Sequence, residues 1–197
     1  MKVNKNDISI LVELLKEDKV IAYPTDTVYG VCARYDHKEA FDALVNCKHR
    51  PSNKAFPLMV SDLNMMKEIG YVSEKMEKVV KAYMPGPITV ILKKKDVIAP
   101  WMNAGQDTIA VRMACDASLK KVIETLGVPI YMTSANLSGE PVLESADEIL
   151  EKMDVAAVVD EAPLRDVAST IVSIEDEVKI LRQGPISLEQ IMKIIEN

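Results

Sequence analysis

Two basic side chains stand two residues apart in this sequence, directly before a proline, where they could hold an anion. Lys48 and Arg50 flank His49, and Pro51 follows. The residue before a proline favours extended backbone, and alternate residues of an extended chain face the same side. We therefore expect the Lys48 and Arg50 side chains to share one space. Two cations placed together need an anionic partner, which predicts a substrate that carries a carboxylate or a phosphate.

Further short polar segments, with the composition of turns and strand ends, accompany this pair. In chain order the seven segments are Tyr23–Gly30, Lys48–Pro51, Pro85–Thr89, Ala110–Arg112, Ser134–Gly139, Ser169–Val172 and Leu181–Gly184. They supply cations and hydroxyl groups but little acid–base apparatus, because His37 and His49 are the two histidines of the chain. The sequence therefore predicts chemistry that rests on positioning and on neutralising negative charge, rather than on a histidine-based triad.

Composition and missing motifs exclude several other classes of protein. The sequence has no G-x-x-x-x-G-K-[ST] or G-x-G-x-x-G loop and no H-E-x-x-H, and its three cysteines are scattered, so neither usual nucleotide-binding loop nor zinc is expected. Scattered cysteines are typical of a reduced, cytoplasmic protein. The net charge is −6, with 24 basic and 30 acidic residues, which predicts weak or absent direct binding to nucleic acids in general, tRNA included. No apolar run approaches membrane-spanning length, which predicts no membrane association.

Helical and strand patterns alternate irregularly along the chain. This alternation predicts an α/β fold, a single domain over residues 1–197 with a twisted, mixed parallel and antiparallel sheet flanked by helices. The expected helices cover residues 8–18, 37–47, 62–69, 73–83, 118–126, 145–153 and 187–195. The expected strands cover residues 20–23, 56–60, 88–92, 108–113, 129–132, 155–159, 170–173 and 178–181. Residues 24–30 are expected to form a turn, and residues 96–106 a loop.

The seven segments in this order resemble the YrdC family, whose best-defined members are threonylcarbamoyladenylate synthases, and the resemblance covers residues 20–186. It implies that L-threonine and bicarbonate or CO2 give a carbamate that attacks the α-phosphorus of ATP. Pyrophosphate leaves, and threonylcarbamoyl-AMP forms for the modification of tRNA adenosine. The resemblance also implies Mg2+ bound through the ATP phosphates, no resident metal, and downstream tRNA-threonylcarbamoyl transfer proteins as partners. The chain resembles the short, single-domain form of the family.

The same resemblance assigns roles to individual residues. Lys48 and Arg50 resemble the catalytic clamp on phosphate and carbamate. The residues that resemble nucleotide ligands are Lys48, Arg50, Lys54, Thr108, Ser134, Asn136, Val142 and Arg182, of which Thr108 and Val142 match by spacing only. The residues that resemble threonine ligands are Thr27, Arg112 and Ser169. Arginine suits the carboxylate, because its planar guanidinium can donate two parallel hydrogen bonds to it.

One departure from the family pattern keeps alternative functions open. Members of the family usually continue directly into Pro-Leu after the position of Lys54, whereas this chain inserts Ala55 and Phe56 before Pro57. The insertion could displace Lys54. It supports one alternative, a paralogue with altered nucleotidyl transfer. The other alternative, which does not depend on the insertion, is an RNA-binding or ribosome-associated YrdC-like module without turnover. Two single residues also have three interpretations each: Asp26 could orient a cation, help place a metal or cap its turn, and Trp101 could stack on a base, form a lid or anchor the packing.

Overall fold

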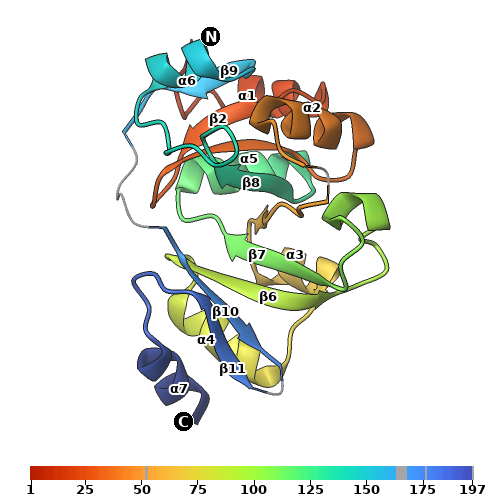
Figure 1. The fold of residues 1–197 in the computed structure, drawn as a ribbon, viewed down its shortest axis with the longest axis vertical. Helices are drawn as coiled ribbons and strands as arrows, with labels where there is room; N and C mark the ends of the chain where they lie inside the picture. The colour runs from red at the N-terminus through yellow and green to blue at the C-terminus, as the bar shows by residue number, and fades with distance from the viewer. Residues whose placement is uncertain (52, 163–167, 176, 197) are drawn as a thin grey trace.

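A single mixed β-sheet runs the length of the molecule, with helices on both faces (Figure 1). The structure is a computed structural model that describes residues 1–51, 53–162, 168–175 and 177–196. Its helices are α1 (Ile8–Lys16), α2 (Lys38–Lys48), α3 (Leu63–Ile69), α4 (Glu74–Tyr83), α5 (Ala117–Leu126), α6 (Ala146–Lys152) and α7 (Leu188–Glu196), with one 3-10 turn, η1 (Pro100–Asn103). Its strands are β1 (Lys2–Val3), β2 (Ile21–Pro24), β3 (Tyr29–Arg34), β4 (Leu58–Val60), β5 (Gly70–Tyr71), β6 (Ile88–Lys94), β7 (Thr108–Met113), β8 (Ile130–Ser134), β9 (Ala157–Val159), β10 (Thr170–Ile174) and β11 (Val178–Arg182).

The strand order is β1-β9-β2-β3-β8-β4-β7-β6-β10-β11, with the short β5 paired to β6. Pairs β1–β9, β9–β2, β4–β7 and β6–β10 are parallel, and the others are antiparallel. This mixture confirms the predicted α/β class. The chain therefore begins at one end of the sheet and closes with α7 at the other, as Figure 1 shows.

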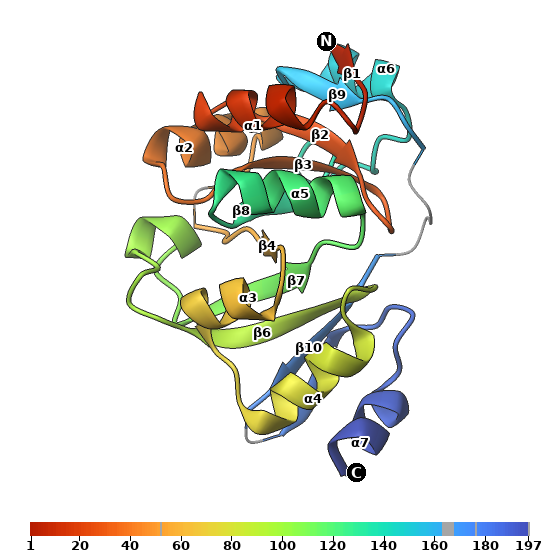
Figure 2. The same cartoon turned by 180° about the vertical axis from the view of Figure 1, so that it is seen from behind.

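Alternate residues of the central strands pack against different helices. In β2, Ile21 and Tyr23 belong to the core formed with α1 and α5, whereas Ala22 faces the larger core that contains residues of α2. Helices α1 and α5 lie beside each other across β2, β3 and β8 (Figure 2). Because both faces are covered, these strands are apolar on both sides.

All seven predicted helices and eight predicted strands are confirmed, and the prediction missed β1, β3 and β5. The most important omission is β3, because it forms a hairpin with β2 in the register Pro24–Tyr29. Only the four residues from Thr25 to Val28 remain as the turn between them. The pattern is hard to read because five of the six residues of β3 are buried, so the strand lacks polar alternation. In the described part of the chain, no helix combines the length and hydropathy that crossing a bilayer requires.

Gly184 stands where backbone segments approach each other too closely for a side chain. A Cβ at this position would lie 2.3 Å from the Thr170 nitrogen and 2.6 Å from the Ala168 oxygen. Backbone atoms cannot move aside as a side chain can, so we expect Gly184→Ala to lower the free energy of unfolding by about 3 kcal/mol. Chemical denaturation measures this loss.

Gly139→Ala is the matched control for that substitution. Gly139 has φ +91°, but a Cβ at this position would meet no atom within 4 Å. Its alanine variant therefore bears backbone strain of about 1 kcal/mol without a clash. Equal losses in the two variants would contradict the close approach at Gly184.

Candidate active site

A cavity of about 150 Å³ lies between the β2–β3 turn, the end of β8 and the start of β10. We call it the central cavity. Five of the residues singled out in the sequence line it: Thr27, Arg112, Ser134, Ser169 and Arg182. These residues are separated by up to 155 positions in the chain, counting from Thr27 to Arg182. The fold therefore brings all three predicted threonine residues to one space, together with two of the eight predicted nucleotide residues, Ser134 and Arg182.

Strand pairing explains how the last two residues reach this cavity. Strand β10 pairs in parallel with β6, so that Thr170 lies beside Ile88. Strand β11 then returns antiparallel and sets Arg182 opposite Ile171. As a result, Ser169 precedes β10 at the cavity wall, and Arg182 lies next to it.

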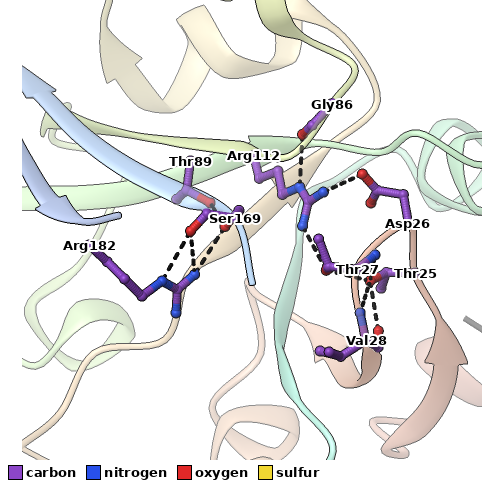
Figure 3. Close-up of polar contacts among 9 residues, drawn as sticks. All are labelled: Thr25, Asp26, Thr27, Val28, Gly86, Thr89, Arg112, Ser169 and Arg182. Carbon is purple, nitrogen blue, oxygen red and sulfur yellow. Dashed lines mark hydrogen bonds and ion pairs between the residues drawn. The ribbon is translucent and has the colours of Figure 1, made fainter. Parts of the chain in front are cut away.

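Arg112, in β7, is buried and held on three sides (Figure 3). Its Nε donates to the Gly86 carbonyl at 3.2 Å, and its Nη1 donates to the Thr27 hydroxyl at 3.1 Å. Its Nη2 forms an ion pair with Asp26. A buried guanidinium needs a compensating charge, and Asp26 supplies it. Of the three interpretations of Asp26, the structure favours the one in which it orients a cation.

The turn itself is stabilised by Thr25 rather than by Asp26. The Thr25 hydroxyl donates to the Val28 carbonyl at 2.7 Å and accepts from the backbone nitrogens of Thr27 and Val28. The Thr27 hydroxyl lies 2.9 Å from that of Thr25. These contacts fix Thr27 where it meets Arg112, so the turn and the arginine form one polar unit.

Ser169 is the centre of a second polar unit on the opposite wall (Figure 3). Its hydroxyl lies 2.9 Å from that of Thr89, and Arg182 donates to its carbonyl from Nε at 3.0 Å and from Nη2 at 2.9 Å. Burial, and then the positive charge of Arg112, lower the pKa of the Arg182 guanidinium. The cavity is thus lined by two arginines whose positive charges repel each other. An anionic ligand would relieve this repulsion, so the cavity favours one.

Thr89 is a site residue that the prediction missed. It lies within the Pro85–Thr89 segment, is buried, and lines the cavity beside Ser169. The segment itself stands out in the sequence by its composition, but nothing local indicates that Thr89 meets a residue 80 positions away.

The predicted geometry of Lys48 and Arg50 is wrong. Lys48 and Asn136 are not among the described residues that line the central cavity, and Lys48 reaches it only through its contact with Ser134. Lys48 is the last residue of α2, and His49 adopts a left-handed conformation with φ 47°, so the segment is not extended. The Lys48 ammonium donates to the Ser134 carbonyl at 2.5 Å and to the Asn136 side-chain oxygen at 2.8 Å. Helix α2 continues one residue beyond its expected end, because the proline restricts Arg50 rather than Lys48.

Lys48 is also far more buried than a residue of a solvated pocket, with 2% of its surface exposed. Burial, and then the nearby charge of Arg50, lower its pKa from 10.5 to about 8. The ammonium is therefore a destabilised charge that a phosphate would stabilise. The adjoining loop is ordered by Asn136, which accepts from the Ser134 hydroxyl at 2.6 Å and donates to the Glu140 carbonyl at 2.8 Å.

A neighbouring pocket of about 290 Å³ contains three other predicted nucleotide residues: Arg50, Lys54 and Thr108. We call it the side pocket, and Pro57 lines both it and the central cavity. Val142 is half-buried and is not among the residues that line either of the two spaces in the described structure.

Trp101 acts as a packing residue. Its ring meets that of Phe41 edge-on, with the ring centroids 6.0 Å apart. Phe41 also contacts Phe56 and Tyr131 edge-on. Of the three interpretations of Trp101, the structure favours the packing anchor.

Comparison with known proteins agrees with this fold and site. The chain is an α/β protein whose mixed sheet carries an arginine-lined cavity, and the model of the Sua5/YciO/YrdC family, described as "telomere recombination", matches its residues 13–184. The chain belongs to the Sua5/YciO/YrdC family.

Individual relatives align with nearly the whole chain at about one third identity. The threonylcarbamoyl-AMP synthase of Bacillus subtilis is 34% identical over 201 residues, which cover 99% of this chain and 58% of that protein. A putative threonylcarbamoyl-AMP synthase of Methanocaldococcus jannaschii is 30% identical, with 98% and 94% covered. The structure of Sua5 from Pyrococcus abyssi complexed with L-threonine superposes with a TM-score of 0.91 at 30% identity, over 99% of this chain and 61% of that one. The chain thus spans less than two thirds of the B. subtilis and P. abyssi relatives.

Proposed function

We propose that this protein is an L-threonylcarbamoyladenylate synthase, which makes threonylcarbamoyl-AMP and pyrophosphate from L-threonine, bicarbonate or CO2, and ATP. The observation that carries the proposal is the convergence of Arg112, Thr27 and Ser169 with Ser134 and Arg182 in one cavity. The names of the relatives point to the same reaction. The product would serve the threonylcarbamoyl modification of tRNA adenosine through downstream transfer proteins.

In the proposed complex, the threonine carboxylate binds Arg112. Two of the guanidinium contacts, to Gly86 and Asp26, fix the plane of the group before a substrate arrives. The hydroxyls of Thr27 and Ser169, on opposite walls, are placed to recognise the amino-acid part of the substrate. Preorganisation of this kind saves the entropy of orienting the groups during binding.

The phosphates of ATP bind Lys48, which contacts the Ser134 carbonyl, and Arg50. A carbamate oxygen of the activated threonine attacks the α-phosphorus, the bond from that phosphorus to the bridging oxygen breaks, and pyrophosphate leaves with the electron pair. The nucleophile is already an anion, so the reaction needs no strong general base. Lys48 and Arg50 neutralise the charge that develops on the transferred group.

Mg2+ would arrive with ATP, held mainly by phosphates and water. Asp26, the acid of the first motif, is already paired with Arg112, so we assign the ion to the phosphates rather than to this carboxylate.

Pyrophosphate release tests the proposal directly. We expect release from ATP to require L-threonine and bicarbonate together, because ATP alone meets no activated nucleophile in this site. The control omits each of the two in turn. Equal release with ATP alone would indicate a plain pyrophosphohydrolase and would contradict the proposal.

From the lowered pKa of Lys48 we expect two opposite pH trends, a fall in kcat/KM for ATP and a rise in the free energy of unfolding. The Lys48 pKa of about 8 means that the free protein loses this positive charge as pH rises through 8, so kcat/KM for ATP should fall there. The unfolded chain keeps the proton up to the ordinary value of 10.5, so the stability contribution of this group should rise with pH between about 8 and 10.5. Rate profiles and denaturation curves over pH 6–10 check both trends, and Lys48→Met should remove both.

An RNA-binding or ribosome-associated module is the second candidate, and it keeps the cavity but not the turnover. The net charge of −6 argues against it, because tight binding to RNA needs many cation–phosphate contacts. A sub-micromolar tRNA complex with a steep salt dependence, in a protein that releases no pyrophosphate, would favour this candidate. A paralogue with altered nucleotidyl transfer would instead release pyrophosphate with a co-substrate other than threonine.

A further inference from the structure

The side chain of Arg50 rests on the segment in which this chain departs from the family pattern. Its Nε donates to the Lys54 carbonyl at 3.2 Å, and its Nη2 donates to the Ala55 carbonyl at 2.9 Å. Its guanidinium carbon lies 4.8 Å from the centroid of the Phe56 ring. Three consecutive residues thus contact one guanidinium, and two of them are the inserted Ala55 and Phe56.

The Phe56 ring that lies against Arg50 packs in an aromatic cluster. Phe56 is 3% exposed, and its ring centroid lies 5.9 Å from that of Phe41 and 5.8 Å from that of Tyr131. The Tyr131 hydroxyl donates to the Met102 carbonyl at 2.9 Å. The cluster therefore joins α2, β8 and η1 beneath the guanidinium.

The chemistry of these three contacts suits a cation that must also bind an anion. Carbonyl oxygens and the face of an aromatic ring carry partial negative charge, so they attract the guanidinium without neutralising it. The two hydrogen bonds use two of the five N–H hydrogens of an arginine, so others can donate to a phosphate. The side pocket that Arg50 lines also contains Lys54 and Thr108, a second cation and a hydroxyl.

We propose that Phe56, together with the carbonyls of Lys54 and Ala55, is a positioning residue that holds the Arg50 guanidinium ready for a phosphate group. The inference rests on the proposed function, since the phosphate would be that of ATP. A fixed arginine loses less side-chain entropy when the anion binds than a mobile one does. The inserted Ala55 and Phe56 then order Arg50, and the insertion does not disrupt the function of the motif.

Two variants of the same aromatic cluster test the proposal. Phe56→Leu removes the ring face beneath Arg50, and Phe56→Met, which fills irregular space more readily, is its substitute if the leucine variant does not fold. Phe41→Leu makes the same chemical change in the same cluster, at a ring whose cationic neighbour is Lys38 rather than Arg50, so it controls for lost packing. The melting temperature of each variant measures how much stability the lost packing removes.

The direct measurement is the Nε–H signal of Arg50 in an ¹⁵N NMR spectrum, assigned by its disappearance in Arg50→Lys. We expect a slowly exchanging signal in the wild type and in Phe41→Leu, and a broadened or lost signal in Phe56→Leu. The KM for ATP should rise about tenfold in Phe56→Leu, with a smaller change in the KM for threonine. This split would not follow from a general loss of stability.

Two results would overturn the proposal. One is an Arg50 signal that survives in the Phe56 variants or is lost equally in Phe41→Leu. The other is a lost signal with an unchanged KM for ATP, which would make the contact structural only. If the wild type releases no pyrophosphate from ATP, the proposed function fails, but the NMR comparison still decides whether Phe56 holds Arg50.

Discussion

Replacing Lys48 by methionine should lower turnover by about 100- to 1,000-fold, and Arg50→Ala should do the same. Loss of one preorganised donor to a developing negative charge typically costs about 3–4 kcal/mol of transition-state stabilisation. Lys48→Met keeps most of the buried side-chain volume, so that the loss reports on the charge. The double variant should be little worse than either single variant, because residues that act on the same charge are not additive. Pyrophosphate release under saturating substrates measures all three.

Lys38→Met is the control for this experiment. Lys38 lies on the same helix but is exposed and pairs with Asp42, so its loss should leave turnover near the wild-type rate. Lys48→Ala is the less informative change: both variants remove the hydrogen bonds to the Ser134 carbonyl and the Asn136 oxygen, but alanine also leaves a cavity in place of a buried side chain. If Lys48→Met kept turnover near the wild-type rate and an unchanged melting temperature, Lys48 would have no role in the reaction.

The second large effect is expected for Arg112→Lys, which should weaken threonine binding by roughly 10- to 100-fold and leave ATP affinity nearly unchanged. A hydrogen bond to a charged group is worth about 1.5–3 kcal/mol. Lysine could keep the charge beside Asp26, but one ammonium cannot reproduce the planar contacts to Gly86, Thr27 and a substrate carboxylate together. Calorimetric titration with each substrate alone measures the two affinities.

Arg34→Lys is the matched control. Arg34 makes a two-pronged contact with Asp36 through Nε and Nη2, and Arg34 does not line the central cavity. This variant should therefore leave both affinities unchanged. A loss of ATP affinity in Arg112→Lys, rather than of threonine affinity, would mean that Arg112 serves the nucleotide.

The features that the sequence predicts well are those with a local cause. Helix α5 ends at Gly127, here with φ 79°, because glycine adopts the required left-handed conformation. The polar segments are also recognisable, since each is contiguous in the chain. Contacts across long separations cannot be found in this way. Neither the pairing of Thr89 with Ser169 nor the ion pair between Asp26 and Arg112 leaves a local pattern.

Lys48 illustrates a different reason for error. A proline restricts the residue before it, but Lys48 lies further back and remains helical, with the change of direction made at His49. The rule applies to Arg50 and does not extend to Lys48. Burial then matters more than spacing, because the ammonium is held by carbonyl and amide oxygens at the end of β8 and in the loop after it.

The position of Ser169 and Arg182 at the edge of the sheet affects how the cavity can open. Strand β11 is the last in the strand order, and β10 joins it to the remainder through β6. Edge elements of this kind can detach by local unfolding at a lower free energy than global unfolding requires. One wall of the cavity would then separate while Arg112 and the β2–β3 turn stayed folded. A ligand that contacts both walls stabilises the closed state by mass action, so occupancy of the cavity should slow amide hydrogen exchange along β10 and β11, including residues that the ligand never touches.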